Sequence, residues 1–118
     1  MRFSLLLLIL AQALKIASFT NARFRAYIGK ADVRVLIKTA DGRRARMFVF
    51  DHGRVSSVAG DGNDFDVALV WRDARTGFAA MTDQSPGASF NAAAEGKLHV
   101  EGMSVYAQWF EDGMKLLL

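Results

Sequence analysis

Three short stretches with strand-like patterns follow one another between residues 33 and 59, and turn residues separate them. Residues 33–39 alternate apolar and polar side chains, which is the period of a β-strand. Asp41-Gly42 then gives a turn signal, and residues 46–50 form the expected returning strand. Residues 55–59 add a third, weaker strand. Because the connections are short, the pattern predicts an antiparallel meander.

The rest of the chain mixes strands and helices. Residues 65–71 alternate like a strand, and a short helix is expected to begin at Arg72-Asp73. A further helix is expected from Ser85-Pro86 to Gly96, since proline is tolerated at the first helical position and glycine ends helices. Residues 98–101 read as a strand, and residues 103–118 as an amphipathic helix. The order predicts an α+β fold with a single, mostly antiparallel five-stranded sheet covered on one face by helices.

The length of 118 residues fits a single domain. We divide it into an N-terminal helical segment, residues 1–30, and a sheet with its covering helices, residues 31–118. Hydrophobic residues make up 52% of the chain, above the usual share for a soluble domain. The chain therefore has apolar material for a core and a surplus that can line a cavity.

The N-terminus allows two interpretations. Leu5 to Leu10 is an apolar run after a basic start, and Ala11-Gln12-Ala13 resembles a signal-peptidase site, so residues 1–13 can be a secretory signal and the protein exported. The alternative is a buried first helix in a cytoplasmic protein. No helix breaker interrupts residues 3–19, and a second apolar set follows at Phe24, Tyr27 and Ile28. We favour the structural helix, because cleavage would remove a helix that a small domain can use to cover its sheet.

The net charge of +3 is distributed unevenly along the chain. Residues 1–59 hold eleven Lys and Arg against three Asp, whereas residues 60–118 hold four Lys and Arg against nine Asp and Glu. Such asymmetry can mark a nucleic-acid or membrane surface. The basic residues are scattered and have no interleaved exposed aromatics, so we expect no nucleic-acid binding and two solvated faces that pair within the fold.

We find no residues arranged for catalysis, for a metal or for a cofactor. The chain has no cysteine, and its two histidines, His52 and His99, are expected to face solvent in a turn and a strand. The acidic loop at residues 60–64 lacks the terminal glutamate of a calcium loop. Asp73 is expected to stabilise a helix start. No phosphate-binding glycine motif or nucleophile elbow occurs.

Several stretches from Val33 onward resemble the sterol-carrier-protein-2-like (SCP2-like) lipid-binding domain family. Residues 49–55 read Val-Phe-Asp-His-Gly-Arg-Val, and residues 65–69 read Phe-Asp-Val-Ala-Leu. The most specific piece is Gly-Lys-Leu-x-Val-x-Gly at residues 96–102, which follows a helix and precedes the final amphipathic helix. The resemblance covers roughly two-thirds of the chain.

The resemblance implies an apolar tunnel between sheet and helices that binds a lipid-like ligand such as a sterol, a fatty acyl chain or an isoprenoid. The protein would then be a carrier or an accessory lipid-presenting factor, and not an enzyme. The alternative is a structural or assembly subunit that kept the fold and has no open cavity. A homodimer and a transient membrane contact stay open as further interactions. The large apolar side chains that we expect to line the tunnel are Phe48, Phe50, Trp71, Phe78, Met81, Phe90, Met103, Tyr106, Trp109, Phe110 and Met114.

Overall fold

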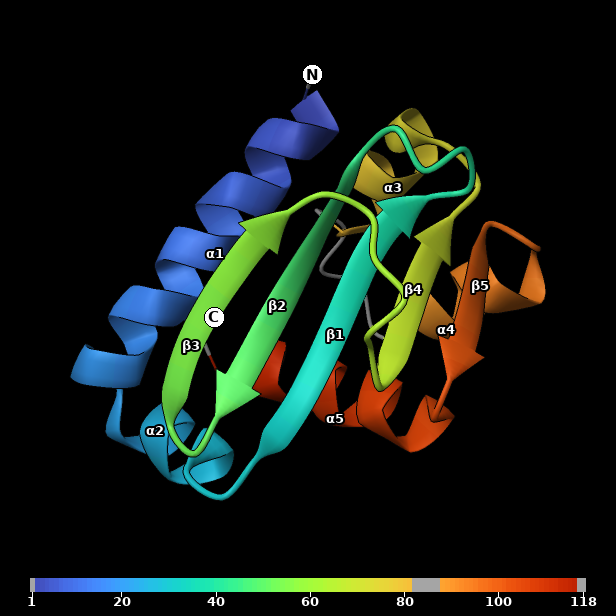
Figure 1. Ribbon diagram of the computed structural model, residues 1–118. Helices are drawn as coiled ribbons and strands as arrows, with labels where there is room; N and C mark the ends of the chain where they lie inside the picture. Colours follow the sequence, from blue (N-terminus) through green and yellow to red (C-terminus); the bar gives the residue numbers. More distant parts are fainter. Residues whose placement is uncertain (1, 82–87, 117–118) are drawn as a thin grey trace.

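The structure is a computed structural model that describes residues 2–81 and 88–116, with the side chains of residues 88–90 outside the description. The chain runs from two helices into three strands, a fourth strand, two helices, a fifth strand and a last helix (Figure 1). The helices are α1 (Arg2–Thr20), α2 (Ala22–Ile28), α3 (Ala74–Met81), α4 (Ala88–Ala94) and α5 (Ser104–Lys115). The strands are β1 (Asp32–Thr39), β2 (Ala45–Asp51), β3 (Arg54–Ala59), β4 (Val67–Trp71) and β5 (Leu98–Gly102).

The predicted α+β class and the five strands are confirmed, but the sheet is mixed and not mostly antiparallel. Its order is β3-β2-β1-β4-β5. β1, β2 and β3 form the expected antiparallel meander, and β4 pairs with β5 antiparallel. At the centre, β4 runs parallel to β1, with Val35 opposite Val67. Alternation within one stretch predicts a strand but does not indicate which other strand it pairs with. The parallel pairing of β1 with β4 was therefore not predicted from the sequence.

The connection between β3 and β4 crosses the sheet on the face away from the helices (Figure 1). Charge pairs hold it there, because Lys38 Nζ lies 3.3 Å from Asp61 Oδ1 and Arg34 pairs with Asp64. The amide of Arg34 also donates to Asp66 Oδ2 at 2.8 Å. Basic residues of the first half thus meet acidic residues of the second half, as we expected from the charge distribution. The connection covers a small second core on this face, made of Leu36, Ala68 and Val70 with Phe65 and Met47 packed against it.

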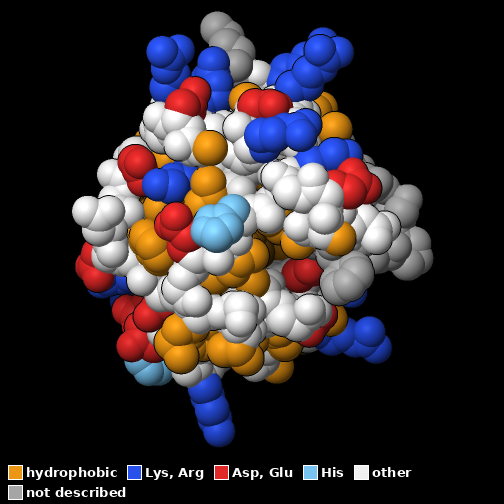
Figure 2. All heavy atoms as spheres, turned by 90° about the vertical axis from the view of Figure 1, so that its right-hand side faces the viewer, with side chains coloured by type: hydrophobic (Ala, Val, Ile, Leu, Met, Phe, Trp, Pro, Cys, Tyr) orange, Lys and Arg blue, Asp and Glu red, His pale blue; other side chains and the backbone are white. Residues whose placement is uncertain are grey.

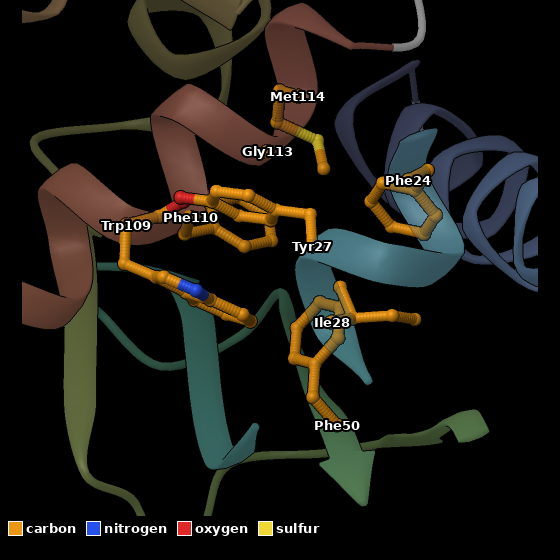
Figure 3. A pocket seen from close by; sticks show the side chains of 8 residues that line it. All are labelled: Phe24, Tyr27, Ile28, Phe50, Trp109, Phe110, Gly113 and Met114. Carbon is orange, nitrogen blue, oxygen red and sulfur yellow. The ribbon is translucent and has the colours of Figure 1, made fainter. Parts of the chain in front are cut away.

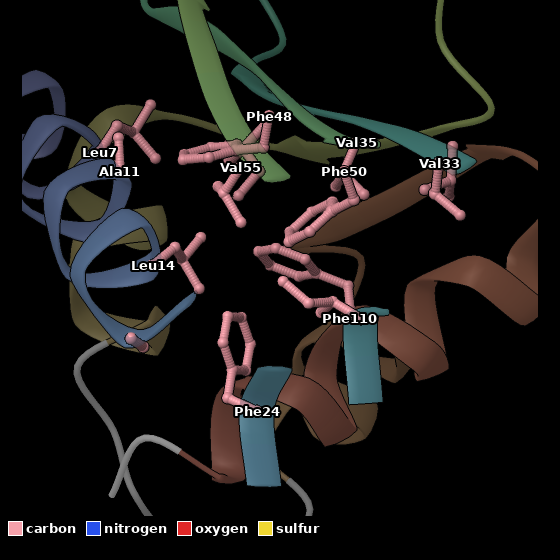
Figure 4. Close-up of a cluster of buried hydrophobic side chains, with 14 of the residues drawn as sticks. Leu7, Ala11, Leu14, Phe24, Val33, Val35, Phe48, Phe50, Val55 and Phe110 are labelled. Atoms are coloured by element: carbon pink, nitrogen blue, oxygen red, sulfur yellow. The ribbon is translucent and has the colours of Figure 1, made fainter. Parts of the chain in front are cut away.

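The main core lies between the sheet and the helices, all of which lie on the other face (Figure 1). Side chains from α1, α2, α5 and the inner faces of β1, β2 and β3 meet there (Figure 4). Phe48, Phe24 and Val35 are fully buried. Burial of large apolar side chains is the main stabilising contribution, at about 1.5–3 kcal/mol each.

The N-terminal segment forms two helices that separate at Asn21. Asn21 has an extended backbone, and its side-chain oxygen accepts a hydrogen bond from the amide of Phe24 at 3.1 Å, as an N-cap residue does. The apolar residues at every third or fourth position of α1 face the core. These buried positions are Phe3, Leu7, Ala11, Leu14 and Ala17.

The Gly-Lys-Leu-x-Val-x-Gly stretch forms strand β5 and the turns at its ends. Gly102 has a φ of +83°, and a Cβ there would lie 2.4 Å from the backbone oxygen of Asp66. The same oxygen accepts a hydrogen bond from the amide of Met103 at 2.9 Å. Only glycine fits this close crossing of two backbones, which sets where α5 starts beneath the sheet.

Candidate functional site

An apolar hollow lies where α2, α5 and the end of β2 meet on the helix-covered face of the sheet (Figure 3). All of its walls are apolar or aromatic side chains, apart from one glycine. The lining residues are Phe24, Tyr27, Ile28, Phe50, Trp109, Phe110, Gly113 and Met114.

Four aromatic rings pack against one another in this hollow. Trp109 stacks on Tyr27, with ring centroids 5.5 Å apart and an interplanar angle of 14°. The same indole meets the ring of Phe50 edge-on at 5.0 Å, and Phe50 meets Phe110 edge-on at 6.1 Å. Figure 3 shows these side chains pointing toward one another from three different elements. Stacked and edge-on pairs contribute about 0.5–1.5 kcal/mol each beyond their buried area.

Tyr27 also joins α2 to α5 through a hydrogen bond. Its Oη donates to the backbone oxygen of Trp109 at 2.7 Å. Burial, with a smaller contribution from the Asp112 carboxylate, raises the pKa of the Tyr27 phenol. A second bond, from Asn21 Nδ2 to the backbone oxygen of Leu116 at 3.1 Å, ties the start of α2 to the end of α5. The two helices are therefore fastened at both ends of the hollow.

The hollow is almost filled by its own lining. Its empty volume is about 140 Å³, and none of that space admits a sphere the size of a water molecule. Sites that bind small molecules have volumes of about 300–1,000 Å³. Gly113 adds to the close fit, because a Cβ there would lie 3.1 Å from Tyr27 Cε1. In this conformation, the described residues around the hollow leave no room for a lipid.

The structure brings together four of the side chains that we predicted to line a tunnel. Phe50, Trp109, Phe110 and Met114 line the hollow. The others lie elsewhere. Phe48 and Trp71 are buried in the main core, and Phe78, Met81 and Tyr106 are half-buried against it. Met103 is 56% exposed at the start of α5. The side chain of Phe90 lies outside the described residues.

Helix α2 contributes lining residues to this site that we did not predict from the sequence. Phe24, Tyr27 and Ile28 line the hollow from that helix, and Gly113 does so from α5. The spacing of the first three, at i, i+3 and i+4, is a signal for one apolar helix face. Nothing in the sequence indicates that this face meets α5 across the end of β2.

The polar candidates lie away from the hollow and on the surface. His52 and His99 are both exposed, as expected. The neighbouring Asp51 carboxylate accepts a hydrogen bond from His52 Nδ1 at 2.7 Å, and this bond raises the pKa of His52. Asp73 accepts a bond from the amide of Thr76 at 2.7 Å, so it stabilises the start of α3 as expected. Among residues 2–81 and 88–116, no three His, Asp or Glu side chains are grouped where they could hold a metal ion.

The sheet order, the helices on one face and the apolar hollow define an SCP2-like fold, and the resemblance inferred from the sequence is confirmed at that level. No protein-family model and no curated protein sequence matches the chain.

The similar solved structures include UbiJ-SCP2, a ubiquinone synthesis protein, with a TM-score of 0.67 and 14% identity over 93% of this chain and 90% of that one. Sterol carrier protein 2 matches with a TM-score of 0.64 and 16% identity, covering 91% of this chain and 92% of that one. The sec-alkylsulfatase Pisa1 from a Pseudomonas species matches over 78% of this chain but only 14% of its own, with a TM-score of 0.55 and 12% identity. The same fold therefore also occurs as a small part of a larger enzyme.

Proposed function

We propose that this protein binds an apolar, lipid-like ligand between its sheet and its helices, without catalysing a reaction, as a carrier or lipid-presenting factor. The ligand would be a sterol, a fatty acyl chain or an isoprenoid chain.

The observation that carries the proposal is the apolar hollow in an SCP2-like fold. Every side chain that lines it is apolar or aromatic, and it lies on the helix-covered face of the sheet. The solved structures of similar fold include a protein named for carrying sterols and one named for ubiquinone synthesis. Aromatic rings and the thioether of Met114 suit a space that repacks around varied hydrocarbon chains.

Ligand entry requires the hollow to widen. The stacked rings of Tyr27 and Trp109 occupy the space between α2 and α5, and they are the groups that would have to separate. The hydrogen bond from Tyr27 to the Trp109 backbone would break or lengthen in that step. An entering hydrocarbon chain would replace the contacts between the rings with other apolar contacts. The apolar surface of the rings would therefore stay largely buried.

Native mass spectrometry of the purified protein, followed by lipid extraction, tests the proposal directly. We expect a bound apolar molecule, whose mass identifies its class. The two tryptophans provide a matched second readout, because they are the only ones in the chain and only Trp109 lies in the hollow. In Trp71→Phe, a fluorescent fatty acid should alter Trp109 emission. In Trp109→Phe, the same ligand should leave the emission of Trp71 nearly unchanged.

Two results would contradict the proposal. One is a protein that carries no lipid and takes up none of the sterol, fatty acid or isoprenoid probes. The other is a ligand that alters Trp71 emission as strongly as Trp109 emission, because that would move the binding site away from the hollow.

A second candidate function is a structural or assembly subunit with the same fold and no open cavity. The filled hollow favours this function, because the space between its described lining residues does not admit a sphere the size of a water molecule. This candidate predicts an empty protein that forms a stable homodimer or a stable complex with another chain. Light scattering of the lipid-free protein, together with the mass spectrum, separates the two functions.

We further propose that α1 stays in the mature protein, which works in the cytoplasm. Removal of residues 1–13 would take Phe3, Leu7 and Ala11 out of the main core. Each of these side chains is buried against the sheet or the other helices. The intact mass of the protein from its native host tests this proposal, because export with cleavage would give a chain that starts at Leu14.

A further inference from the structure

Strand β5 lies at one edge of the sheet, and its side away from β4, the open edge, has no hydrogen-bonded neighbour among residues 2–81 and 88–116 (Figure 1). Figure 2 looks onto this side of the molecule, where hydrophobic side chains reach the surface between acidic and basic ones. An edge strand offers a row of amide and carbonyl groups to another chain, unless charges, prolines or a covering element prevent pairing. β5 contains no proline, and its titratable side chains are those of His99 and Glu101.

The hydrogen bonds at the two ends of β5 show which of its residues face the open edge. At one end the amide of Arg72 donates to the backbone oxygen of Lys97 at 2.8 Å, and at the other the amide of Met103 donates to the backbone oxygen of Asp66 at 2.9 Å. Alternate residues of an antiparallel strand bond to the same neighbour, so every second residue from 97 to 103 bonds toward β4. The first, third and fifth residues of β5 therefore turn their amide and carbonyl groups toward the open edge.

We propose that two copies of the chain join their β5 strands at these open edges, antiparallel and about a two-fold axis at Val100. In this register Val100 faces the partner's Val100, and Leu98 faces the partner's Gly102. Every residue that turns its backbone groups toward the open edge thus meets one that does the same. The two sheets would become one continuous sheet across the axis.

The same register brings complementary side chains together. His99 faces the partner's Glu101, and Glu101 faces the partner's His99. Both side chains are exposed, and their neighbours on β4 are the apolar residues Val70 and Ala68. A carboxylate accepts a hydrogen bond from an imidazole and attracts its protonated form, and opposite charges on facing strands stabilise a sheet. The order of these two residues therefore favours the pairing of two copies.

The other edge strand, β3, has no such match. Arg54 is its one charged residue, so two copies of β3 have no opposite charges to pair. Helix α1 also packs alongside β3 (Figure 1). A contact of β5 with the β3 of the next copy would leave further edges open and give growing assemblies, whereas the two-fold contact of β5 closes at two copies.

Two neighbouring elements would extend the contact beyond the strands. Helix α4 packs against β5, so it would lie beside the partner's α4, where the exposed Ala93 and Ala94 are small enough for a close approach. The start of α5 would lie beside the turn between the partner's α4 and β5. Met103 and Val105 are 56% and 64% exposed there, and this turn would cover them. None of these residues lines the hollow, so the pairing does not depend on a bound ligand.

Sedimentation of the full chain, with charge substitutions in β5, tests the proposal. The wild type should sediment as a dimer. Glu101→Lys removes the carboxylate that faces the partner's His99, and His99→Glu places two carboxylates opposite each other. Each should raise the Kd of the dimer about tenfold, because the two-fold axis makes every substitution act twice. Combining the two substitutions restores opposite charges across the axis and should restore the dimer.

Ser56→Lys is the matched control for these charge changes. Ser56 is exposed on β3, at the other edge of the sheet. The variant gains the same lysine side chain as Glu101→Lys and should dimerise like the wild type. Circular dichroism should show that all of these variants are folded.

A second measurement locates the axis. The chain has no cysteine, so a single introduced thiol reports on one position. The Cα atoms of a hydrogen-bonded antiparallel pair lie about 5.5 Å apart, a distance that a disulfide spans. Val100→Cys should therefore give a disulfide-linked dimer under mild oxidation. Val58→Cys is the control, because Val58 is 64% exposed but lies on β3, and its thiol should stay largely unlinked.

Four results would overturn the proposal. They are a monomer at every concentration, a dimer that neither single charge substitution weakens, a doubly substituted chain that does not regain the dimer, and cross-linking of Val58→Cys that is as fast as that of Val100→Cys. A mass that keeps rising with concentration would also contradict it, because β5 would then pair with the β3 of the next copy.

Discussion

Helices α1 and α5 both cover the same face of the sheet, yet their outer sides differ. On α5, Phe110 and Gly113 are buried, and the polar residues Gln108, Asp112 and Lys115 face outward. On α1, both the inner and the outer sides are apolar. A helix that only covers a sheet needs the α5 pattern, with one apolar side. The outer apolar side of α1 is therefore not needed to cover the sheet, and substitutions on the two sides of the helix can be compared.

The largest effect is expected on the inner side of α1. Leu14 is fully buried, so Leu14→Ala should lower the free energy of unfolding by about 2–5 kcal/mol. Two positions further along, Ile16→Ala on the outer side should change it by less than about 0.5 kcal/mol. Urea unfolding of both variants measures the difference. Similar losses in the two variants would mean that the outer side of α1 is buried in solution.

A smaller effect is expected where α1 meets α3. A Cβ on Gly77 would lie 2.8 Å from Phe3 Cε1 and 2.9 Å from Trp71 Cγ. Gly77→Ala should therefore destabilise the protein by about 1–3 kcal/mol through overpacking, although alanine favours helix formation. Thermal unfolding measures the loss. Adding Phe3→Leu should restore part of it, and no restoration would mean that Phe3 does not pack against α3.

The contact of α5 with α2 can be tested with Tyr27→Phe. This change removes the hydroxyl that donates to the Trp109 backbone and keeps the stacked ring. We expect a loss of about 0.5–1.5 kcal/mol in the free energy of unfolding, the usual contribution of one hydrogen bond. Because the bond would break when the hollow opens, the variant should also bind a lipid probe faster than the wild type. A slower association would contradict the role of this bond in closing the hollow.

The smallest effect is a dependence on alkaline pH. The pKa of Tyr27 is raised in the folded state, so the neutral phenol contributes stability that is fully present below pH about 10. That contribution is lost as the pH rises through the folded pKa. The free energy of unfolding of the wild type, measured at a series of pH values, should fall more steeply above pH 10 than that of Tyr27→Phe. Parallel curves would show that Tyr27 titrates with its ordinary pKa.

The sequence predicted individual elements well where local signals are strong. The alternation in residues 33–39, the turn at Asp41-Gly42 and the helix signal at Asp73 all depend on neighbours in the chain, and all three are confirmed. Helix and strand boundaries shifted slightly. Residues 65 and 66 precede β4. The amide and carboxylate of Asp66 bond to the backbone of Arg34, and its carbonyl oxygen accepts from the amide of Met103.

The candidate site was predicted only in part, for a physical reason. Phe50, Trp109, Phe110 and Met114 have the same chemistry as core residues, so the sequence does not distinguish a side chain that lines a hollow from one that fills it. Which of the predicted residues meet depends on how α5 crosses the sheet. That crossing is set by the backbone contact between Gly102 and Asp66, neither of which lines the hollow.

The parallel pair at the centre of the sheet also has a consequence for the order of folding. Val35 pairs with Phe48 in β2 and with Val67 in β4. The sequence separation of Val67 from Val35 is more than twice that of Phe48 from Val35. Closing the longer loop costs more chain entropy, and local contacts form faster than distant ones. The three-stranded meander should therefore assemble first, and β4 and β5 should join it after the rate-limiting step. Substitutions in β2 should then slow folding, whereas those in β4 should mainly accelerate unfolding.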